Sequence, residues 1–568
     1  MSQASAQEQT SILRRFLGVI RSHLSLPGLA VGAVCFALSL TPSLIPRTFL
    51  IQGVLAGCVF AVGYAVGATF EWLWYFLQLK PPKGRLRFWL TAITAAICTV
   101  IVVFCMSRAA EWQNSVRLAM GAEPVQTGHP IQVLLVAILP AVVLITLGTL
   151  LAVGINFVAH KLRRLVPPRI AMLVSLVVVG FLAATLFNGF LLRGALRTAD
   201  AFFEQLDDVS SRFVEPPPTN PTQSGSAQSL ISWSTIGRDG RNYVQTGPDK
   251  AAIERRIGRP AMEPLRVSVG MRSAPTVEAR AALALAELKR VGAFDRDVLL
   301  VISPVGTGWV DPAGMDSLEY LMAGDVASVS LQYSYLLSPL SLLVEPDYGG
   351  EAAKALFDAV YTYWTALPHD RRPRLYLNGL SLGAHASQNS TQILDVLRDP
   401  YQGALWAGPP FTSPIWRWAT ANRNPGSPEW RPEVSEGGTF RFSNQGDGLA
   451  DPRGKPWGPI RIGFLQYASD PIVFFDPHTL YREPDWMKGE RGPDVSKELT
   501  WYPIVTLFQL GMDMALALTS PLGHGHVYAP ADYIDAWMVL VEPTGWDAES
   551  LSRLKSEMTR EFEEKEKQ

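Results

Sequence analysis

The sequence has 568 residues, of which 48% are hydrophobic and only 18% are charged, and its formal net charge is −1. This length exceeds one ordinary domain, and the charged fraction lies below the roughly 25% of an average soluble protein. This near-neutral balance gives no indication of a nucleic-acid partner, so none is predicted.

Apolar stretches fill the first third of the chain. Five of them are long enough to cross the roughly 30 Å hydrocarbon core of a bilayer as helices. They run over approximately 28–46, 49–78, 88–107, 131–158 and 169–193, within a predicted membrane domain at 28–195. The same third contains every cysteine of the chain, namely Cys35, Cys58, Cys98 and Cys105. The remainder can therefore form no disulfide and no cysteine-ligated zinc site.

Two pairs of glycines indicate that these helices pack closely. Gly53 and Gly57 are four residues apart in the second stretch, and so are Gly63 and Gly67. Small residues at this spacing let two helix backbones approach each other in a membrane. We therefore expect a packed bundle.

Basic residues gather in alternate connections between the predicted spans. They are Arg14, Arg15 and Arg21 before the first span, Lys80, Lys83, Arg85 and Arg87 after the second, and Lys161, Arg163, Arg164 and Arg169 after the fourth. The positive-inside rule then places the N-terminal segment 1–27 in the cytoplasm of a multi-pass plasma-membrane protein. Five crossings put the C-terminal domain outside the cytoplasm. No small-residue cleavage site follows a short apolar region, so no removable signal peptide is predicted.

A proline-rich run separates the membrane domain from the C-terminal part of the chain. Residues 196–262 are predicted as an extracytoplasmic linker, because 215–226 hold four prolines and cannot form a helix or a central strand. The pattern of a folded domain extends from 263 to 545, and 546–568 form a charged C-terminal tail.

Short apolar runs alternate with amphipathic stretches from residue 263 onward. The apolar runs predict strands, and the amphipathic stretches predict helices at 277–291, at 351–367, from 382 onward and at 531–540; the strands are at 265–269, 298–303, 326–333 and 374–377. This alternation predicts an α/β domain with a mostly parallel sheet and helices on both faces. Functional residues of such sheets gather at the carboxyl ends of the strands.

One strand end carries a motif for nucleophilic catalysis. Residues 379–383 read Gly-Leu-Ser-Leu-Gly, so Ser381 stands between Gly379 and Gly383. A very tight strand-to-helix turn exposes such a serine, and glycines two residues before and after it remove side chains that would collide. The amide of Leu382 and the helix N-terminus then face the oxyanion that develops during attack. Ser381 is the predicted nucleophile.

The serine needs an orienting carboxylate, which follows it in the chain ahead of a histidine. Asp470 is the predicted acid, because an apolar strand from 460 runs into the turn Ser-Asp-Pro. Asp447 and Asp451, in a glycine-rich loop after 440–443, are the alternatives.

Three histidines lie beyond Asp470. His478 follows it after only eight residues, which leaves little chain for another element. His524 and His526 lie on a glycine-rich loop just before the helix at 531–540. We favour His526 as the general base because it is nearer that helix, and His524 is the alternative base.

The oxyanion hole needs a second N–H donor from the loop after an earlier strand. The loop 304–309 directly follows the strand at 298–303 and contains two glycines, which let the backbone approach a substrate. Thr307 or Gly308 is the predicted donor. This chemistry requires no cofactor and no metal.

The segment 379–383, Asp470 and His526, in this order, resemble the alpha/beta-hydrolase superfamily over roughly 263–545. The stretch 39–47 resembles the membrane-domain signature of a poorly characterised, largely actinobacterial family in which a multi-span N-terminal domain precedes an alpha/beta-hydrolase domain. The resemblance implies the fold and serine chemistry. It does not imply a lipase, because the His-Gly-Gly oxyanion motif of many lipases and esterases is absent.

A long segment between Asp470 and His524 contains the apolar stretch 501–518, in which Asp513 is the one charged residue. Either a lid or membrane-facing cap over the site, or a buried core helix, explains this composition. Under the cap interpretation, neutralising Asp513 should change fold and activity little.

Two classes of function fit this sequence. The first is a membrane-anchored serine hydrolase or acyltransferase that cleaves or transfers acyl groups of lipid or cell-envelope esters or thioesters. The second is a non-catalytic transport or sensor protein with a degenerate hydrolase domain. The complete Ser-Asp-His set favours the enzyme, and the scarcity of ionisable residues in the predicted spans argues against ion transport.

Overall fold

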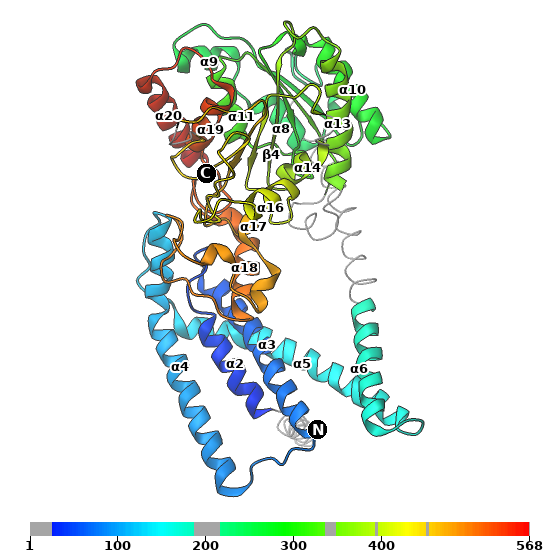
Figure 1. Cartoon of the computed structure of the whole chain (residues 1–568), viewed down its shortest axis with the longest axis vertical. Coiled ribbons are helices and arrows are strands. Elements are labelled where there is room, and N and C mark those ends of the chain that lie inside the picture. Colours follow the sequence, from blue (N-terminus) through cyan, green and yellow to red (C-terminus); the bar gives the residue numbers. More distant parts are fainter. Residues whose placement is uncertain (1–24, 187–215, 336–347, 392–395, 450–453, 567–568) are drawn as a thin grey trace, which may run out of the picture. The chain divides into compact units, whose positions relative to one another are not determined.

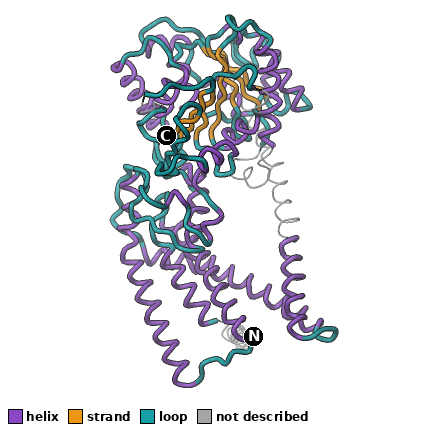
Figure 2. The backbone as a smooth tube through the Cα atoms, viewed as in Figure 1, coloured by secondary structure: helices purple, strands orange, loops and turns teal. Residues whose placement is uncertain are grey.

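The computed structural model describes residues 25–186, 216–335, 348–391, 396–449 and 454–566. They divide into two compact units. The first unit takes in the described part of Met1–Leu191 and two later segments, Pro477–Pro484 and Ser496–Asp513. The second unit contains the remaining described residues and all the strands (Figure 2).

The first unit is helical. Its main elements are α2 (Leu26–Leu38), α3 (Phe49–Phe76), α4 (Gly84–Ala119), α5 (Pro130–Leu162) and α6 (Pro168–Thr185), seen in blue to cyan in Figure 1. Among the described residues, four helices are long and apolar enough to cross a membrane, namely α3 to α6. They correspond to the last four predicted spans.

The first predicted span, 28–46, is wrong as a continuous helix. The helix α2 ends at Leu38 and has 13 residues, which gives it a length of about 20 Å against the roughly 30 Å of a bilayer core. Pro42 and Pro46 explain the interruption, because proline supplies no amide donor and pushes the residue before it out of the helical region. The chain after α2 is irregular but buried, with Leu44 and Ile45 each 1% exposed.

The glycine pairs of α3 lie where neighbouring helices approach it. A Cβ atom added at Gly57 would lie 2.3 Å from the carbonyl oxygen of Ala137 in α5, and one at Gly53 would lie 2.5 Å from Val136 Cβ. A Cβ atom at Gly67 would lie 2.4 Å from the carbonyl oxygen of Pro27 in α2. The two pairs therefore serve two different helix contacts, as close packing of small residues requires.

The apolar stretch 501–518 forms α18 (Val505–Ala515) and a short 3₁₀ helix, Ala517–Thr519. Val505 packs in a cluster with Cys35, Leu55 and Val59 of the first unit. Asp513 is fully buried, and its two carboxylate oxygens accept hydrogen bonds of 2.9 Å from the hydroxyl of Ser43 and the amide of Leu44. The buried-helix interpretation is therefore correct, although the partner is the membrane unit and not the sheet.

The buried bonds of Asp513 contradict what the cap interpretation predicts for it, namely that its charge is dispensable. Asp513→Ala removes both acceptors and leaves two buried donors unpaired, which should lower the free energy of unfolding by about 3 kcal/mol. Thermal unfolding of the full-length protein in a mild detergent measures this loss. Glu498→Ala, at an exposed acid of the same unit, is the matched control and should change stability by less than about 0.5 kcal/mol. Equal stability of the two variants would contradict the structural role of Asp513.

The second unit is built on a seven-stranded sheet of order β1-β3-β2-β4-β5-β7-β6. All its strand pairs are parallel, which confirms the predicted α/β architecture. The strands are β1 (Leu265–Val269), β2 (Val298–Ile302), β3 (Val326–Leu331), β4 (Arg374–Leu380), β5 (Gly403–Ala407), β6 (Phe440–Ser443) and β7 (Arg461–Leu465). The interior strand β2 reads Val-Leu-Leu-Val-Ile and is buried throughout, as expected for a parallel strand covered on both faces.

Helices cover both faces of this sheet. On one face lie α10 (Val277–Arg290), α13 (Tyr348–Thr365) and α14 (Leu382–Ser390); on the other lie α11 (Pro312–Leu321), α19 (Pro530–Val541) and α20 (Ala548–Glu566), as Figure 1 shows. Shorter helices are α8 (Arg238–Thr246), α9 (Lys250–Ile257), α16 (Pro414–Ala421) and α17 (Pro471–Phe474). A hydrophobic core that includes Trp537 and Tyr376 lies between the sheet and α11, α19 and α20.

Two predicted domain boundaries differ from the structure. The second half of the predicted linker carries α8 and α9, and its Tyr243 and Ile253 belong to the core between the sheet and α11, α19 and α20. The predicted charged tail forms α20, whose Leu554 and Met558 are buried in the same core. Both segments are rich in charged residues, but their apolar residues recur at helical spacing and cover the sheet. Residues 196–215 lie outside the described part of the chain.

Candidate active site

The turn from β4 to α14 holds Ser381 in a strained conformation. Its φ is 55° and its ψ is −123°, a region that non-glycine residues rarely adopt and that costs about 1–3 kcal/mol. A Cβ atom on Gly379 would lie 2.4 Å from the carbonyl carbon of Gly383, and one on Gly383 would lie 2.1 Å from the carbonyl oxygen of Ser303. Both glycines are thus required for the turn, for the reason that the sequence pattern indicated.

Ser381 lies at the carboxyl edge of the sheet with its backbone well anchored. Its amide donates to the carbonyl of Ala407 at the end of β5, over 3.0 Å. Ser381 is 9% exposed, and its hydroxyl makes no hydrogen bond with any residue that the structure describes. Leu382 follows as the first residue of α14, where an amide has no partner within the helix. An anion beside the serine would therefore meet a free N–H and the positive end of the helix.

Asp470 lies five residues after β7 and begins the short helix α17. Its Oδ1 accepts a 2.9 Å hydrogen bond from the amide of Ile472, and its side chain is fully buried. Its Oδ2 accepts from two groups, Nδ1 of His526 and the hydroxyl of Tyr528, each at 2.7 Å. These donors fix the carboxylate in one orientation and compensate the cost of burying it.

His526 is held by Asp470 and leaves its other ring nitrogen free. Because Nδ1–H donates to the carboxylate, the neutral imidazole carries its lone pair on Nε2. That Nε2 is buried and has no hydrogen-bond partner among the described residues. An imidazole in this state can accept a proton from a hydroxyl group placed beside Nε2.

Two consecutive residues at the end of β5 contact the serine and the histidine. Ser381 is bonded to Ala407, and the next residue, Gly408, lies against the imidazole. A Cβ atom on Gly408 would lie 2.6 Å from Cε1 of His526, so glycine is required here for the ring to approach the sheet edge. The structure thus gathers the predicted nucleophile, acid and base at one edge.

The loop that carries His526 is fixed by polar contacts from its surroundings. The amide of Gly525 donates to the hydroxyl of Ser469 over 2.8 Å, and that hydroxyl donates to the carboxylate of Asp494. The amide of His526 donates to the carbonyl of Ala517 over 3.2 Å. The position of the imidazole is therefore set by the backbone as well as by Asp470.

The alternative base lies in a different environment. Nδ1 of His524 lies 3.3 Å from the carbonyl oxygen of Leu522, and the residue is partly exposed. The described contacts bring no carboxylate to its ring.

The remaining candidates do not join this cluster. Asp447 is bonded to Ser443 and the amide of Asn444, and it forms a 2.8 Å ion pair with Arg431. His478 is in the first unit, in the 3₁₀ helix Pro477–Leu480. The alternative acid Asp451 lies outside the described residues.

The two amides proposed as the second oxyanion donor, those of Thr307 and Gly308, differ in whether they are already hydrogen-bonded. The amide of Gly308 donates to the carbonyl of Val305 over 2.8 Å and is therefore already engaged. No described residue accepts from the amide of Thr307, and the Thr307 hydroxyl donates to Asp239 over 2.6 Å, which fixes the loop. Because Gly383 lies against Ser303 at the end of β2, this loop leaves the sheet directly beside the turn. The contacts favour Thr307 over Gly308 as the second donor.

Sequence reasoning missed three side chains of this site. Tyr528 donates to the catalytic carboxylate candidate, Ser469 holds the histidine loop, and Asp311 lies close enough to His526 for their charges to interact. Burial raises the pKa of Asp311 to about 6, although a hydrogen bond from Tyr533 opposes the shift. The available signals were local: Tyr528 is two residues from His526, and Ser469 precedes Asp470. Within the described residues, no group of three or more His, Cys, Asp or Glu side chains is arranged to hold a metal ion.

Comparisons with known proteins identify the family. Residues 265–554, more than half of the chain, match the model of a family described as "Alpha/beta-hydrolase family". Residues 40–248 match the model described as "Alpha/beta-hydrolase family N-terminus". No curated protein and no solved structure matches the chain. The two matches follow one another along the chain and cover both units, so the chain belongs to this alpha/beta-hydrolase family, N-terminal region included.

Proposed function

We propose that this protein is a membrane-anchored serine hydrolase or acyltransferase that uses Ser381, His526 and Asp470. The observation that carries the proposal is the bond between Asp470 and Nδ1 of His526, beside a serine held at a φ of 55°. A strained turn and a buried carboxylate both reduce stability, and they are expected to persist where they serve catalysis. A degenerate domain would be free to lose them.

The proposed reaction proceeds through an acyl-enzyme. The Ser381 hydroxyl attacks the acyl carbon while Nε2 of His526 takes its proton, and the amides of Leu382 and Thr307 stabilise the oxyanion. The imidazolium, held by Asp470, then gives the proton to the leaving alcohol or thiol as the bond to the acyl carbon breaks. Water or a second alcohol attacks the acyl-enzyme while His526 takes its proton. His526 then returns that proton to the Ser381 oxygen as the bond between this oxygen and the acyl carbon breaks, which releases the acid or the new ester.

The substrates we propose are acyl esters or thioesters of lipids or of the cell envelope. Within the part of the chain that the structure describes, four helices long and apolar enough to span a membrane precede the hydrolase domain. Anchoring there keeps an enzyme beside substrates that partition into or protrude from the bilayer. Membranes that contain the full-length protein should hydrolyse p-nitrophenyl acyl esters. Added glycerol tests acyl transfer, because an acyltransferase forms acylglycerol at the expense of free acid. Absence of turnover across short and long acyl chains would contradict the proposal.

We further propose that the hydrolase domain lies outside the cytoplasm of a plasma-membrane protein. The basic residues of 80–87 and 161–169 favour a cytoplasmic location for both of these connections. Ser43 and Leu44, on the opposite α2–α3 connection, bind Asp513 of a segment inserted in the hydrolase sequence. A reporter that is active only outside the cytoplasm should work when fused after Asp200 and fail when fused within 79–87. The reverse pattern would overturn the orientation and leave the serine chemistry standing.

A further inference from the structure

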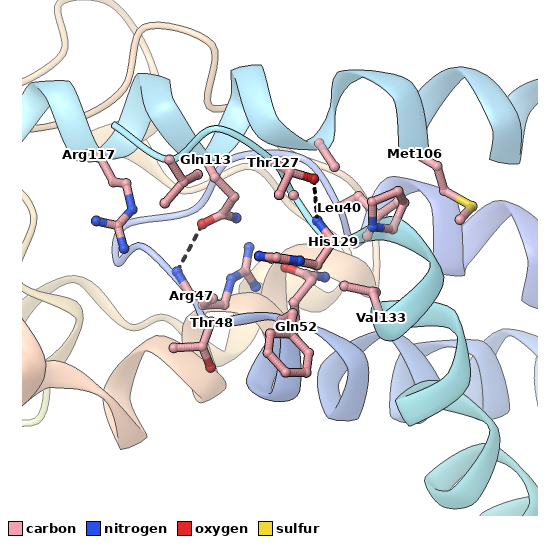
Figure 3. A pocket seen from close by; sticks show the side chains of 15 residues that line it. Leu40, Arg47, Thr48, Gln52, Met106, Gln113, Arg117, Thr127, His129 and Val133 are labelled. Atoms are coloured by element: carbon pink, nitrogen blue, oxygen red, sulfur yellow. Dashed lines mark hydrogen bonds between the residues drawn. The ribbon is translucent and has the colours of Figure 1, made fainter. Parts of the chain in front are cut away.

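The first unit contains a cavity of about 250 Å³ that the serine chemistry does not use. The end of the α2–α3 connection with the first turn of α3, the helix α4, and the loop that enters α5 with the first turn of α5 supply its walls. Figure 3 shows the side chains of Arg47, Gln52, Gln113 and His129 pointing toward one another across it. All the residues that line the cavity belong to this one unit.

Arg47 is a buried cation whose hydrogen-bonding capacity is mostly unused. Its side chain is 6% exposed, and its Nε and Nη1 have no hydrogen-bond partner among the described residues. Its Nη2 reaches the carbonyl oxygen of Thr41 at 3.3 Å. Gln52, 5% exposed on the same wall, has an unpartnered Oε1. Buried polar groups left in this state cost free energy, so a ligand that pairs with them would bind favourably.

The charged side chains that line the cavity are basic. They are Arg47 and Arg117, the imidazole of His129 stands beside them, and no Asp or Glu is among the lining residues. His129 is the residue before α5, so the positive end of that helix dipole lies at the cavity. The amide of His129 donates to the hydroxyl of Thr127 and Pro130 has no N–H, so the helix contributes its dipole there and no free amide. Asp513 interacts with the charge of Arg47, but its oxygens are bonded to Ser43 and Leu44. An oxyanion is the ligand that these groups recognise.

The other wall is apolar. Leu40, Phe49, Met106 and Val133 line it, and in Figure 3 Met106 and Val133 lie away from Arg117. At about 30 Å³ for each water molecule, the volume corresponds to roughly eight waters. A phosphate or carboxylate with the first carbons of an alkyl chain fits this volume, whereas a bulky zwitterionic headgroup does not.

We propose that this cavity binds the phosphate or carboxylate head of an anionic amphiphile. The guanidinium groups of Arg47 and Arg117 hold the oxyanion near the positive end of the α5 dipole, and the alkyl chain lies along the apolar wall. The site is separate from the Ser381 cluster and does not depend on the proposed function.

Binding of dodecyl phosphate to the full-length protein in an uncharged maltoside detergent tests the proposal. Titration calorimetry should show saturable binding. Dodecylphosphocholine, which has the same chain but a capped phosphate, and inorganic phosphate, which has no chain, should each bind at least tenfold more weakly. Arg47→Gln should weaken dodecyl phosphate binding by at least tenfold.

Arg117→Gln is a second variant, which keeps the proposal testable if Arg47→Gln fails to fold. Because Arg117 is only partly buried, the protein should tolerate its replacement. It should weaken binding several-fold. Arg108→Gln is the matched control on the same helix, since Arg108 pairs with Glu111 and does not line the cavity. Failure of the wild type to bind dodecyl phosphate, or equal affinity of the wild type and both cavity variants, would overturn the site. If inorganic phosphate binds as tightly as dodecyl phosphate, the ligand is a free anion and the proposal of an amphiphile is wrong.

Discussion

Ser381→Ala is expected to abolish ester turnover and labelling by a fluorophosphonate probe while leaving the fold intact. Only a serine activated by an imidazole attacks such a phosphorus centre readily, so the probe should modify Ser381 alone. Loss of the nucleophile should reduce kcat by a factor on the order of 10⁴ to 10⁶. The hydroxyl has no hydrogen bond to a described residue, and alanine retains the Cβ atom, so the melting temperature should stay the same.

Ser390→Ala is the matched control for this substitution. Ser390 is a buried serine on the same helix, α14, and its hydroxyl donates to the carbonyl of Ser387 within that helix. Its variant should keep both labelling and turnover. A wild-type protein that takes no probe, or a Ser381→Ala variant that still turns over esters, would show that the serine-enzyme proposal is wrong.

The α/β unit was largely predictable because its elements carry local signals. The buried strand β2 is an uninterrupted apolar run, and α10 begins at Thr276, whose side chain accepts from the amide of Ala279 in an N-cap. The strand β5 was not predicted, because its five residues begin with a glycine and are followed directly by a Gly-Pro-Pro turn. Its place comes from pairing with β4 and β7 on either side, which no local pattern encodes.

The candidate site was predictable for a different reason. The geometry of the turn at Ser381 demands glycines at fixed spacing, so its residues are readable in a single stretch. Asp470 and His526 followed from the order of the set along the chain, and the choice between His524 and His526 came from position relative to a helix. Asp311 interacts with the charge of His526 from a distant part of the chain and carries no motif that marks it, whereas Tyr528 lies only two residues after His526.

The membrane unit shows where local sequence patterns cease to be sufficient. Hydropathy averaged over 28–46 predicts a span, but Pro42 and Pro46 end the helix early. The role of Asp513 was missed because its partner Ser43 lies 470 residues away in the sequence. A charged residue in an apolar helix is exposed on one face or paired on the other, and only the tertiary structure decides which.

His526→Ala is the second substitution with a large expected effect, and His524→Ala is its matched control. Removing the imidazole that takes the serine proton should lower kcat by a factor on the order of 10⁴ and prevent fluorophosphonate labelling. His524 lacks a carboxylate partner in the described contacts and is partly exposed, so its variant should keep turnover within about threefold of the wild type.

Chemical rescue separates loss of the base from loss of the loop. His526 is buried between Asp470 and Gly408, so alanine leaves a space of imidazole size beside a carboxylate that still has the bond from Tyr528. Added imidazole should therefore restore part of the turnover of His526→Ala and none of that of Ser381→Ala. If His524→Ala loses activity and regains it with imidazole while His526→Ala stays active, the base is His524. If neither variant loses activity, neither histidine accepts the serine proton and the proposed mechanism fails.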